Sequence, residues 1–225
     1  MKKCIFALAA ALMLSASGLA YAQVTAEQLK ERKELAKASK KDLNEKATKA
    51  ARKEAKKLSK QGWLTAPGAL PLEKQLDKSY LMQYQYDGDG FPQYIMAEAM
   101  STGGNYDAAK MQALELAKQN LAGQIQTEVT SLIENTVAND QMDQGQAASV
   151  TRSVMASKNL ITQSIGRVVP VIETYRVVGG NNREVLVRIA YSQDMAKAAA
   201  KKAMRQELEA RGDSLHAQLD NLLGW

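Results

Sequence analysis

Side chains that do chemistry are scarce in this chain, which holds one cysteine, one histidine and only 5% aromatic residues. A zinc site needs several His or Cys ligands, and a serine hydrolase needs a base, usually histidine. The single histidine, His216, falls in a charged segment predicted to be helical, and no serine motif lies near it. Paired carboxylates can also hydrolyse substrates, but no pair is marked by its spacing. We therefore expect no catalytic residue, metal or cofactor, and keep a hydrolase of the cell envelope as the alternative.

The single cysteine, Cys4, belongs to a segment with the features of a secretory signal. Two lysines precede an apolar run at residues 5–14, and residues 20–22 (AYA) give the small-x-small pattern that signal peptidase recognises. The run is shorter than the roughly 20 residues that span a bilayer, so we expect cleavage after Ala22 and export. Cys4 precedes the apolar run instead of standing at the cleavage point, so no lipid is expected. The mature chain then has no disulfide and no later segment apolar enough to span a membrane.

Charge is divided unevenly along the chain. Residues 25–60 hold 13 Lys/Arg against 6 Asp/Glu, whereas residues 61–225 hold 15 against 18. Residues 25–61 are rich in strong helix formers and predict one long helix, which Gly62 ends with a left-handed cap and Trp63 folding back. Its cations either contact anionic envelope polymers or lipid headgroups, or simply keep a helix soluble. The candidate contacts are Lys40, Lys41, Lys49, Arg52, Lys53, Lys56 and Lys57.

Nucleic acid is not an expected partner of this basic arm, because the chain is predicted to be exported and the arm has no interleaved aromatics for base stacking.

After the arm, Leu72, Leu76, Tyr80 and Tyr84 repeat every fourth residue and predict a short helix at residues 71–85. The stretch DGDG at residues 87–90 predicts a turn, since no closing glutamate follows at the spacing of a calcium loop.

One strand and two helices are predicted next. Residues 94–100 alternate as a half-buried strand, and residues 101–104 read as a loop before a helix that Asn105 caps. That helix, residues 105–137, has small residues in its first half and bulky ones in its second, which suits close packing on a sheet and then on a diverging helix. Its predicted face is Ala109, Ala113, Leu116, Ala117, Leu121, Ile125, Val129, Leu132 and Thr136. A second helix is predicted to run from a polar loop to about residue 165.

A β-hairpin and a last helix complete the prediction. Residues 167–178 and 184–191 flank GGNN, which is strong hairpin-turn chemistry, and Pro170 must lie at an edge or a bulge. Ser192 can cap the helix that follows. Its stripe, Met204, Leu208, Gly212, Leu215, Leu219 and Leu222, has coiled-coil spacing. We expect it to pack within the chain, against the basic arm, with a seam between subunits as the alternative. The tripeptide RGD at residues 211–213 falls in this predicted helix, so adhesion through it is not expected.

These segments together resemble a known envelope family. The strand PQYIMAEAM, the helix DAAKMQALELAKQNLAGQIQTEV and the hairpin VVPVIETYRVVGGNNREVLVRIAYS are similar to small bacterial outer-membrane-associated lipoproteins, which include the FlgP type and the FlgT N-terminal domain. The resemblance covers about residues 91–192. It implies an α+β domain with helices on one face of a small antiparallel sheet, acting by contact in envelope assemblies. The lipid-bearing cysteine is missing and both flanking segments depart from the pattern, so a flagellar function is not carried over.

The predicted organisation is a signal peptide (1–22), a basic helical arm (23–62), a linker with a short helix (63–90), an α+β domain (91–192) and a C-terminal helix (193–225). The fold class is α+β, with a three-stranded antiparallel sheet packed on one face by long helices. The predicted function is an exported, non-enzymatic binding or scaffolding protein of the periplasm or envelope. Its expected partner is another envelope protein or an anionic envelope polymer, and the C-terminal helix is a candidate for oligomerisation.

Overall fold

The fold is described from a computed structural model, which covers residues 44–66, 68–138 and 144–211, together with residues 30, 33, 34 and 37. The chain divides into two compact units, Met1–Glu45 and Lys46–Trp225. The sheet and the helices that pack on it belong to the second unit. The predicted α+β class is confirmed. Among the described residues, no helix combines the length and the apolar composition that crossing a membrane would require.

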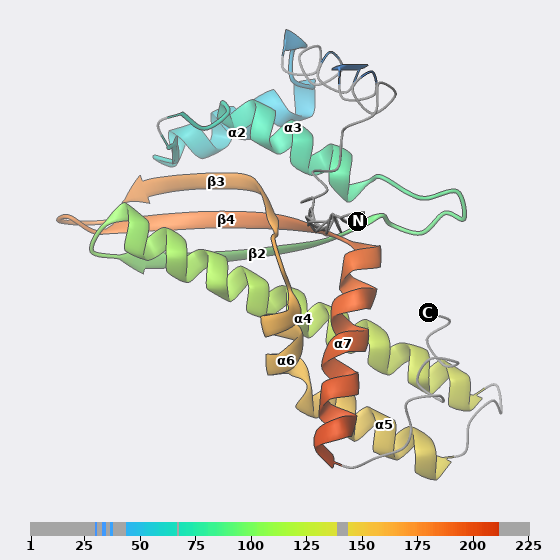
Figure 1. Cartoon of the computed structure of the whole chain (residues 1–225). Coiled ribbons are helices and arrows are strands. Elements are labelled where there is room, and N and C mark those ends of the chain that lie inside the picture. Colours follow the sequence, from blue (N-terminus) through green and yellow to red (C-terminus); the bar gives the residue numbers. More distant parts are fainter. Residues whose placement is uncertain are drawn as a thin grey trace, which may run out of the picture. The chain divides into compact units, whose positions relative to one another are not determined.

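A four-stranded antiparallel sheet lies at the centre of this unit (Figure 1). Its strands are β1 (Leu64–Thr65), β2 (Tyr94–Gly103), β3 (Val169–Val177) and β4 (Arg183–Ser192), in the spatial order β1-β3-β4-β2. The prediction of three strands was one short. The missing strand, β1, has two residues and pairs only with Tyr175 and Thr174 of β3, so it is too short to show an alternating pattern.

The predicted hairpin between β3 and β4 is confirmed. Gly179 and Gly180 have φ angles of 87° and 53°, a conformation that side chains with a Cβ rarely adopt. The Val178 N–H donates to the Asn182 carbonyl at 3.2 Å and closes the turn. The register shifts between Pro170 and Ile172, so Pro170 lies at the predicted bulge.

Helix α4 (Tyr106–Ala138) covers one face of the sheet, and its predicted extent is confirmed within one residue. The Asn105 side chain caps it by accepting the Ala108 N–H at 2.8 Å. The residues buried against the sheet and neighbouring helices are Ala109, Ala113, Ala117, Leu121, Ala122, Ile125, Val129 and Ile133. Leu116 and Leu132 were wrongly predicted on this face: they are 38% and 42% exposed. The side chain of Thr136 lies outside the described residues.

The second predicted helix is interrupted, which corrects the sequence prediction. It forms α5 (Gln144–Ala156) and α6 (Lys158–Ser164), with Ser157 buried between them. The Ser157 hydroxyl donates to the Val154 carbonyl at 2.8 Å. A serine that hydrogen-bonds the preceding turn is a common cause of a helix bend. The residue predicted to end the helix, Gly166, follows Ile165, the C-cap of α6.

The last helix, α7 (Gln193–Arg211), is capped by Ser192, whose hydroxyl accepts the Met195 N–H at 3.3 Å. Its stripe residues Met204 and Leu208 are buried in the same cluster as Val154 and Ile161. The predicted packing within the chain is therefore confirmed for these two residues, but they pack with the helices α4 to α6 and not with α2, the described helix of the basic arm. No coiled coil is seen in the described part of α7, and the rest of the stripe lies beyond it, as does His216.

The opposite face of the sheet is covered by α2 (Lys49–Lys60) and α3 (Leu72–Gln83), so the prediction of helices on one face only was wrong (Figure 1). A second apolar cluster holds them there: Ala47, Ala51, Ala55, Leu72, Leu76 and Ile172. Gln75 also links α3 to β3 by a hydrogen bond. Its buried side chain accepts the Glu173 N–H and donates to the Leu70 carbonyl, both at 2.7 Å. Of the predicted α3 stripe, Tyr84 is wrongly placed, since it is 65% exposed.

The prediction of one continuous helix over residues 25–61 was wrong in its C-terminal part. Residues 45–48 are not helical, and α2 starts afresh at Lys49 with Thr48 as its N-cap. The Thr48 hydroxyl accepts the Ala51 N–H at 3.3 Å. The predicted end is confirmed: Gly62 has a φ of 86°, and the Trp63 N–H donates to the Leu58 carbonyl at 3.1 Å. This 6→1 bond is the mark of a Schellman motif.

Candidate functional site

The outward face of α2 carries a row of cations. Helix α2 contains six Lys/Arg and a single acid, Glu54. Its apolar residues Ala51 and Ala55 are buried against the sheet, so the helix has one fixed orientation. At 100° per residue, the side opposite them bears Lys49, Lys53, Lys56 and Lys60. These four lysines are exposed and extend over about 16 Å of helix. We call them, with the flanking Arg52 and Lys57, the basic face.

The structure brings most of the predicted contacts together on this face. Lys49, Arg52, Lys53, Lys56 and Lys57 all belong to it and are exposed. Lys57 also forms an ion pair with Glu54 at 3.6 Å. Lys40 and Lys41 lie outside the described residues. Lys60 was missed, although its spacing of four from Lys56 is visible in the sequence.

The buried side of α2 decides how the basic face can bind. An amphipathic helix that lies in a membrane needs a free apolar face to insert, whereas the apolar face of α2 is already used in the protein core. The exposed side of α2 offers a partner mainly its cations. The basic face can therefore attract an anionic surface electrostatically, without insertion, and such attraction is screened by salt.

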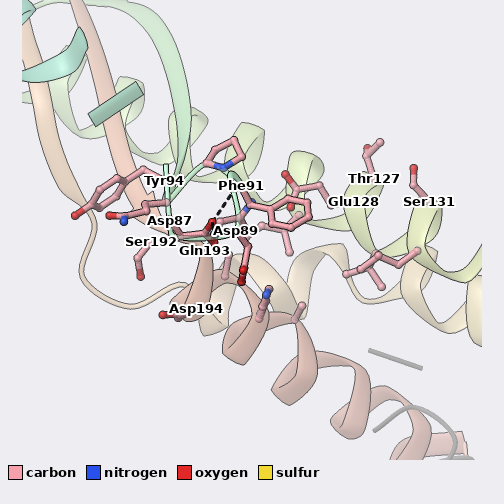
Figure 2. A pocket seen from close by; sticks show the side chains of 18 of the residues that line it. Asp87, Asp89, Phe91, Tyr94, Thr127, Glu128, Ser131, Ser192, Gln193 and Asp194 are labelled. Carbon is pink, nitrogen blue, oxygen red and sulfur yellow. Dashed lines mark hydrogen bonds between the residues drawn. The ribbon is translucent and has the colours of Figure 1, made fainter. Parts of the chain in front are cut away.

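A groove lies on the other side of the sheet, and the sequence did not reveal it. It has a volume of about 960 Å³ and is enclosed by three segments: the turn after α3, the C-terminal half of α4 and the start of α7 (Figure 2). Its apolar lining includes Phe91, Pro92, Ile125, Val129, Leu132, Ala196 and Ala200. Hydrogen bonds shape the turn, since Asp87 Oδ1 accepts the N–H groups of Asp89 at 3.0 Å and Phe91 at 2.8 Å. The predicted DGDG turn is thus confirmed, and it serves as one wall.

The groove is rimmed mainly by acids. Asp87, Asp89, Glu128 and Asp194 line it, against a single lysine, Lys197. Glu128 is exposed, but the protein around it partly desolvates its carboxyl and raises the pKa, while a hydrogen bond from Gln193 and the charge of Lys197 lower it by less. Because the pKa of Glu128 is raised on balance, its negative charge at neutral pH is held at a small cost to the folded protein, which solvent screening reduces.

This cost leads to a stability prediction for Glu128→Gln. A carboxyl whose pKa is higher in the folded than in the unfolded state loses stability as pH rises from the unfolded to the folded value. The wild type should therefore be penalised at pH 7, and Glu128→Gln should unfold at a higher urea concentration there. The gain should shrink at a pH below the ordinary pKa of glutamate. A variant less stable than wild type at pH 7 would show that the contacts to Gln193 and Lys197 outweigh the desolvation.

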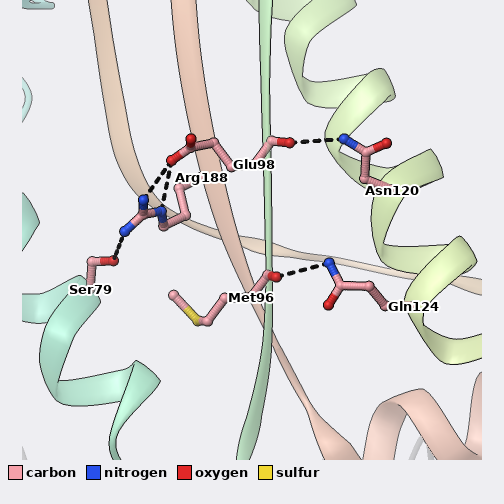
Figure 3. Close-up of polar contacts among 6 residues, drawn as sticks. All are labelled: Ser79, Met96, Glu98, Asn120, Gln124 and Arg188. Carbon is pink, nitrogen blue, oxygen red and sulfur yellow. Dashed lines mark hydrogen bonds and ion pairs between the residues drawn. The ribbon is translucent and has the colours of Figure 1, made fainter. Parts of the chain in front are cut away.

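The remaining polar clusters near the sheet hold the fold together. Arg188 on β4 pairs with Glu98 at 2.7 Å and donates to the Ser79 hydroxyl at 3.1 Å, which ties α3 to the sheet (Figure 3). The side chains of Asn120 and Gln124 on α4 donate to the carbonyls of Glu98 and Met96 on the edge strand β2, at 2.9 and 3.1 Å. These amides occupy hydrogen-bonding positions through which an edge strand would otherwise pair with another chain.

A third polar cluster joins α4 to β3. The Tyr106 hydroxyl and the Lys110 ammonium both donate to the Glu173 carboxylate, the second at 2.7 Å. Burial and the neighbouring carboxylate raise the pKa of Tyr106, so it stays a hydrogen-bond donor. In the described part of the chain, no three His, Cys, Asp or Glu side chains are grouped to hold a metal ion.

Comparison of the chain with protein-family models, with curated proteins and with solved structures finds no match. The resemblance to outer-membrane-associated lipoproteins therefore remains a prediction. Two surfaces are left to suggest what the protein does, namely the basic face of α2 and the acid-rimmed groove.

Proposed function

We propose that this protein is an exported, non-enzymatic binding protein of the bacterial cell envelope that attaches to anionic surfaces through the basic face. The observation that carries this proposal is the fixed orientation of α2. Burial of Ala51 and Ala55 turns four lysines outward together, so their charges add over one short stretch of surface. The signal-like N-terminus supports export, and phosphate groups of lipids or envelope polymers are anions available there.

The proposal predicts a large loss of vesicle binding when Lys49, Lys53 and Lys56 are all replaced by glutamine. Each basic residue near an anionic membrane contributes about 1 kcal/mol, so the triple variant should bind phosphatidylglycerol vesicles roughly 100-fold more weakly. Binding of the mature wild type should also fall steeply between 0.1 and 1 M salt, where the Debye length drops from about 10 to 3 Å. Co-sedimentation measures both effects.

A matched control separates position from net charge. Lys118, Lys158 and Lys202 lie on α4, α6 and α7, away from α2, and their replacement by glutamine removes the same charge. This control variant should keep most of the binding. Competition by soluble polyphosphate would show whether a phosphate polymer can replace the lipid headgroup. Equal loss in both triple variants, or binding that does not respond to salt, would contradict the proposal.

A further inference from the structure

Most of the apolar lining of the groove is already packed in the protein core. Ile125, Val129, Ala196 and Ala200 line the groove but are at most 3% exposed, because they belong to the main apolar cluster. A partner can therefore contact only the lining that stays exposed, on α4 and on the turn before β2. The α4 wall, from residue 125 to residue 135, is about 15 Å long, which corresponds to nearly three helical turns.

Part of this apolar lining is still open to solvent. Leu132 is 42% exposed and Phe91 is 67% exposed. Both are large side chains in the groove wall, and neighbouring exposed apolar residues in a concave, polar-rimmed site are typical of an interaction surface. A partner that buries them would gain free energy in proportion to the apolar area removed from water.

The rim decides which partner fits. Four carboxylates surround the apolar lining against one ammonium group, so a positively charged partner is attracted and an anionic one is repelled. Residues 212–225 of this chain are a poorer occupant, because the two aspartates among them would face the acids of the rim.

We propose that the groove binds a basic segment of a partner protein, whose apolar side chains cover Leu132 and Phe91 and whose Lys or Arg residues face the acidic rim. This inference goes beyond the proposed function and uses different residues. The basic face and the groove lie on opposite sides of the sheet, so one molecule can hold an anionic surface and a basic partner at once. The protein would then act as an adaptor between the two.

The test uses the full mature chain and a designed peptide of about 14 residues, long enough to cover the α4 wall, with leucines at helical spacing and lysines elsewhere. Calorimetry should give binding that weakens with salt. A peptide of the same pattern with glutamate in place of lysine should not bind. The variant Asp89→Asn/Glu128→Gln/Asp194→Asn should bind the lysine peptide at least tenfold more weakly, while its vesicle binding stays at the wild-type level.

A control variant and two competing occupants complete the test. Glu73→Gln/Glu115→Gln/Glu209→Gln removes three charges from exposed positions outside the groove and should bind the peptide like wild type. Equal weakening in both triple variants would overturn the proposal. So would tenfold tighter binding by Leu215→Asp/Leu219→Asp, since the chain's own C-terminal segment would then be the occupant. A wild-type dimer that the groove variant dissociates in sedimentation would assign the groove to a second copy and would also overturn it.

Discussion

Replacing Leu121 by alanine is expected to lower the free energy of unfolding by about 2–5 kcal/mol. Leu121 is fully buried in the main apolar cluster, at the point of α4 where alanines give way to bulky residues. Removing its side chain loses the transfer free energy and leaves a cavity that neighbours on the sheet and on α4 cannot fill without moving. Urea unfolding followed by circular dichroism measures the loss as a lower midpoint at an unchanged slope.

Leu116→Ala is the matched control, because it makes the same chemical change on the same helix. Leu116 is 38% exposed, so its truncation removes less buried surface, and alanine is the better helix former. We expect a loss below about 1 kcal/mol. The sequence pattern alone placed both leucines on one buried face and predicts similar losses. Equal destabilisation by the two variants would therefore favour the sequence pattern and contradict the packing described above.

Gly103→Ala is expected to cost about 1–3 kcal/mol, the range for overpacking a well-packed site. Gly103 ends β2, and a Cβ built on it would lie 2.8 Å from the backbone nitrogen of Ala109 and 3.2 Å from its Cα. Backbone atoms of a helix cannot turn aside as a flexible side chain would. The start of α4 would have to move away from the sheet, and Ala113 would move with it. The same urea experiment measures this loss.

The neighbouring glycine supplies the control for that variant. A Cβ on Gly104 meets no atom within 4 Å, and its φ is not in the left-handed region. Gly104→Ala should therefore leave stability unchanged or raise it by about 0.4–1 kcal/mol, through the lower entropy of the unfolded chain. If Gly103→Ala proved as harmless as Gly104→Ala, the close approach of α4 to the end of β2 would be refuted.

Local sequence signals predicted the elements that depend on local chemistry. The hairpin of β3 and β4 follows from two glycines and alternating strands, and the start of α4 follows from the cap at Asn105. The Schellman end of α2 follows from Gly62. In each case the decisive hydrogen bonds join residues close in the chain, so their spacing can be seen in the sequence.

Elements that depend on distant partners were missed or misplaced. Strand β1 consists of two residues that are ordered by Tyr175 and Thr174, far along the chain. Gln75 is a polar residue on a predicted short helix, and it is buried because its side chain accepts the N–H of Glu173, 98 positions further along the chain. Helical periodicity also could not decide whether Leu132 or Ile133 is the buried residue of α4. Both fit the apolar stripe of the helix, and the choice depends on where the neighbouring helices pack.

The two candidate sites differ in the same way. The cationic and amphipathic character of α2 can be read from the sequence, because charge and helical spacing are properties of consecutive residues. Its alanines are buried, and its lysines face outward together, because α2 packs against Leu72, Leu76 and Ile172 from elsewhere in the chain. The groove depends wholly on the tertiary structure. Asp89, Glu128 and Asp194 come from three separate segments, so no sequence pattern shows that they lie close together once α4, α7 and the turn have packed.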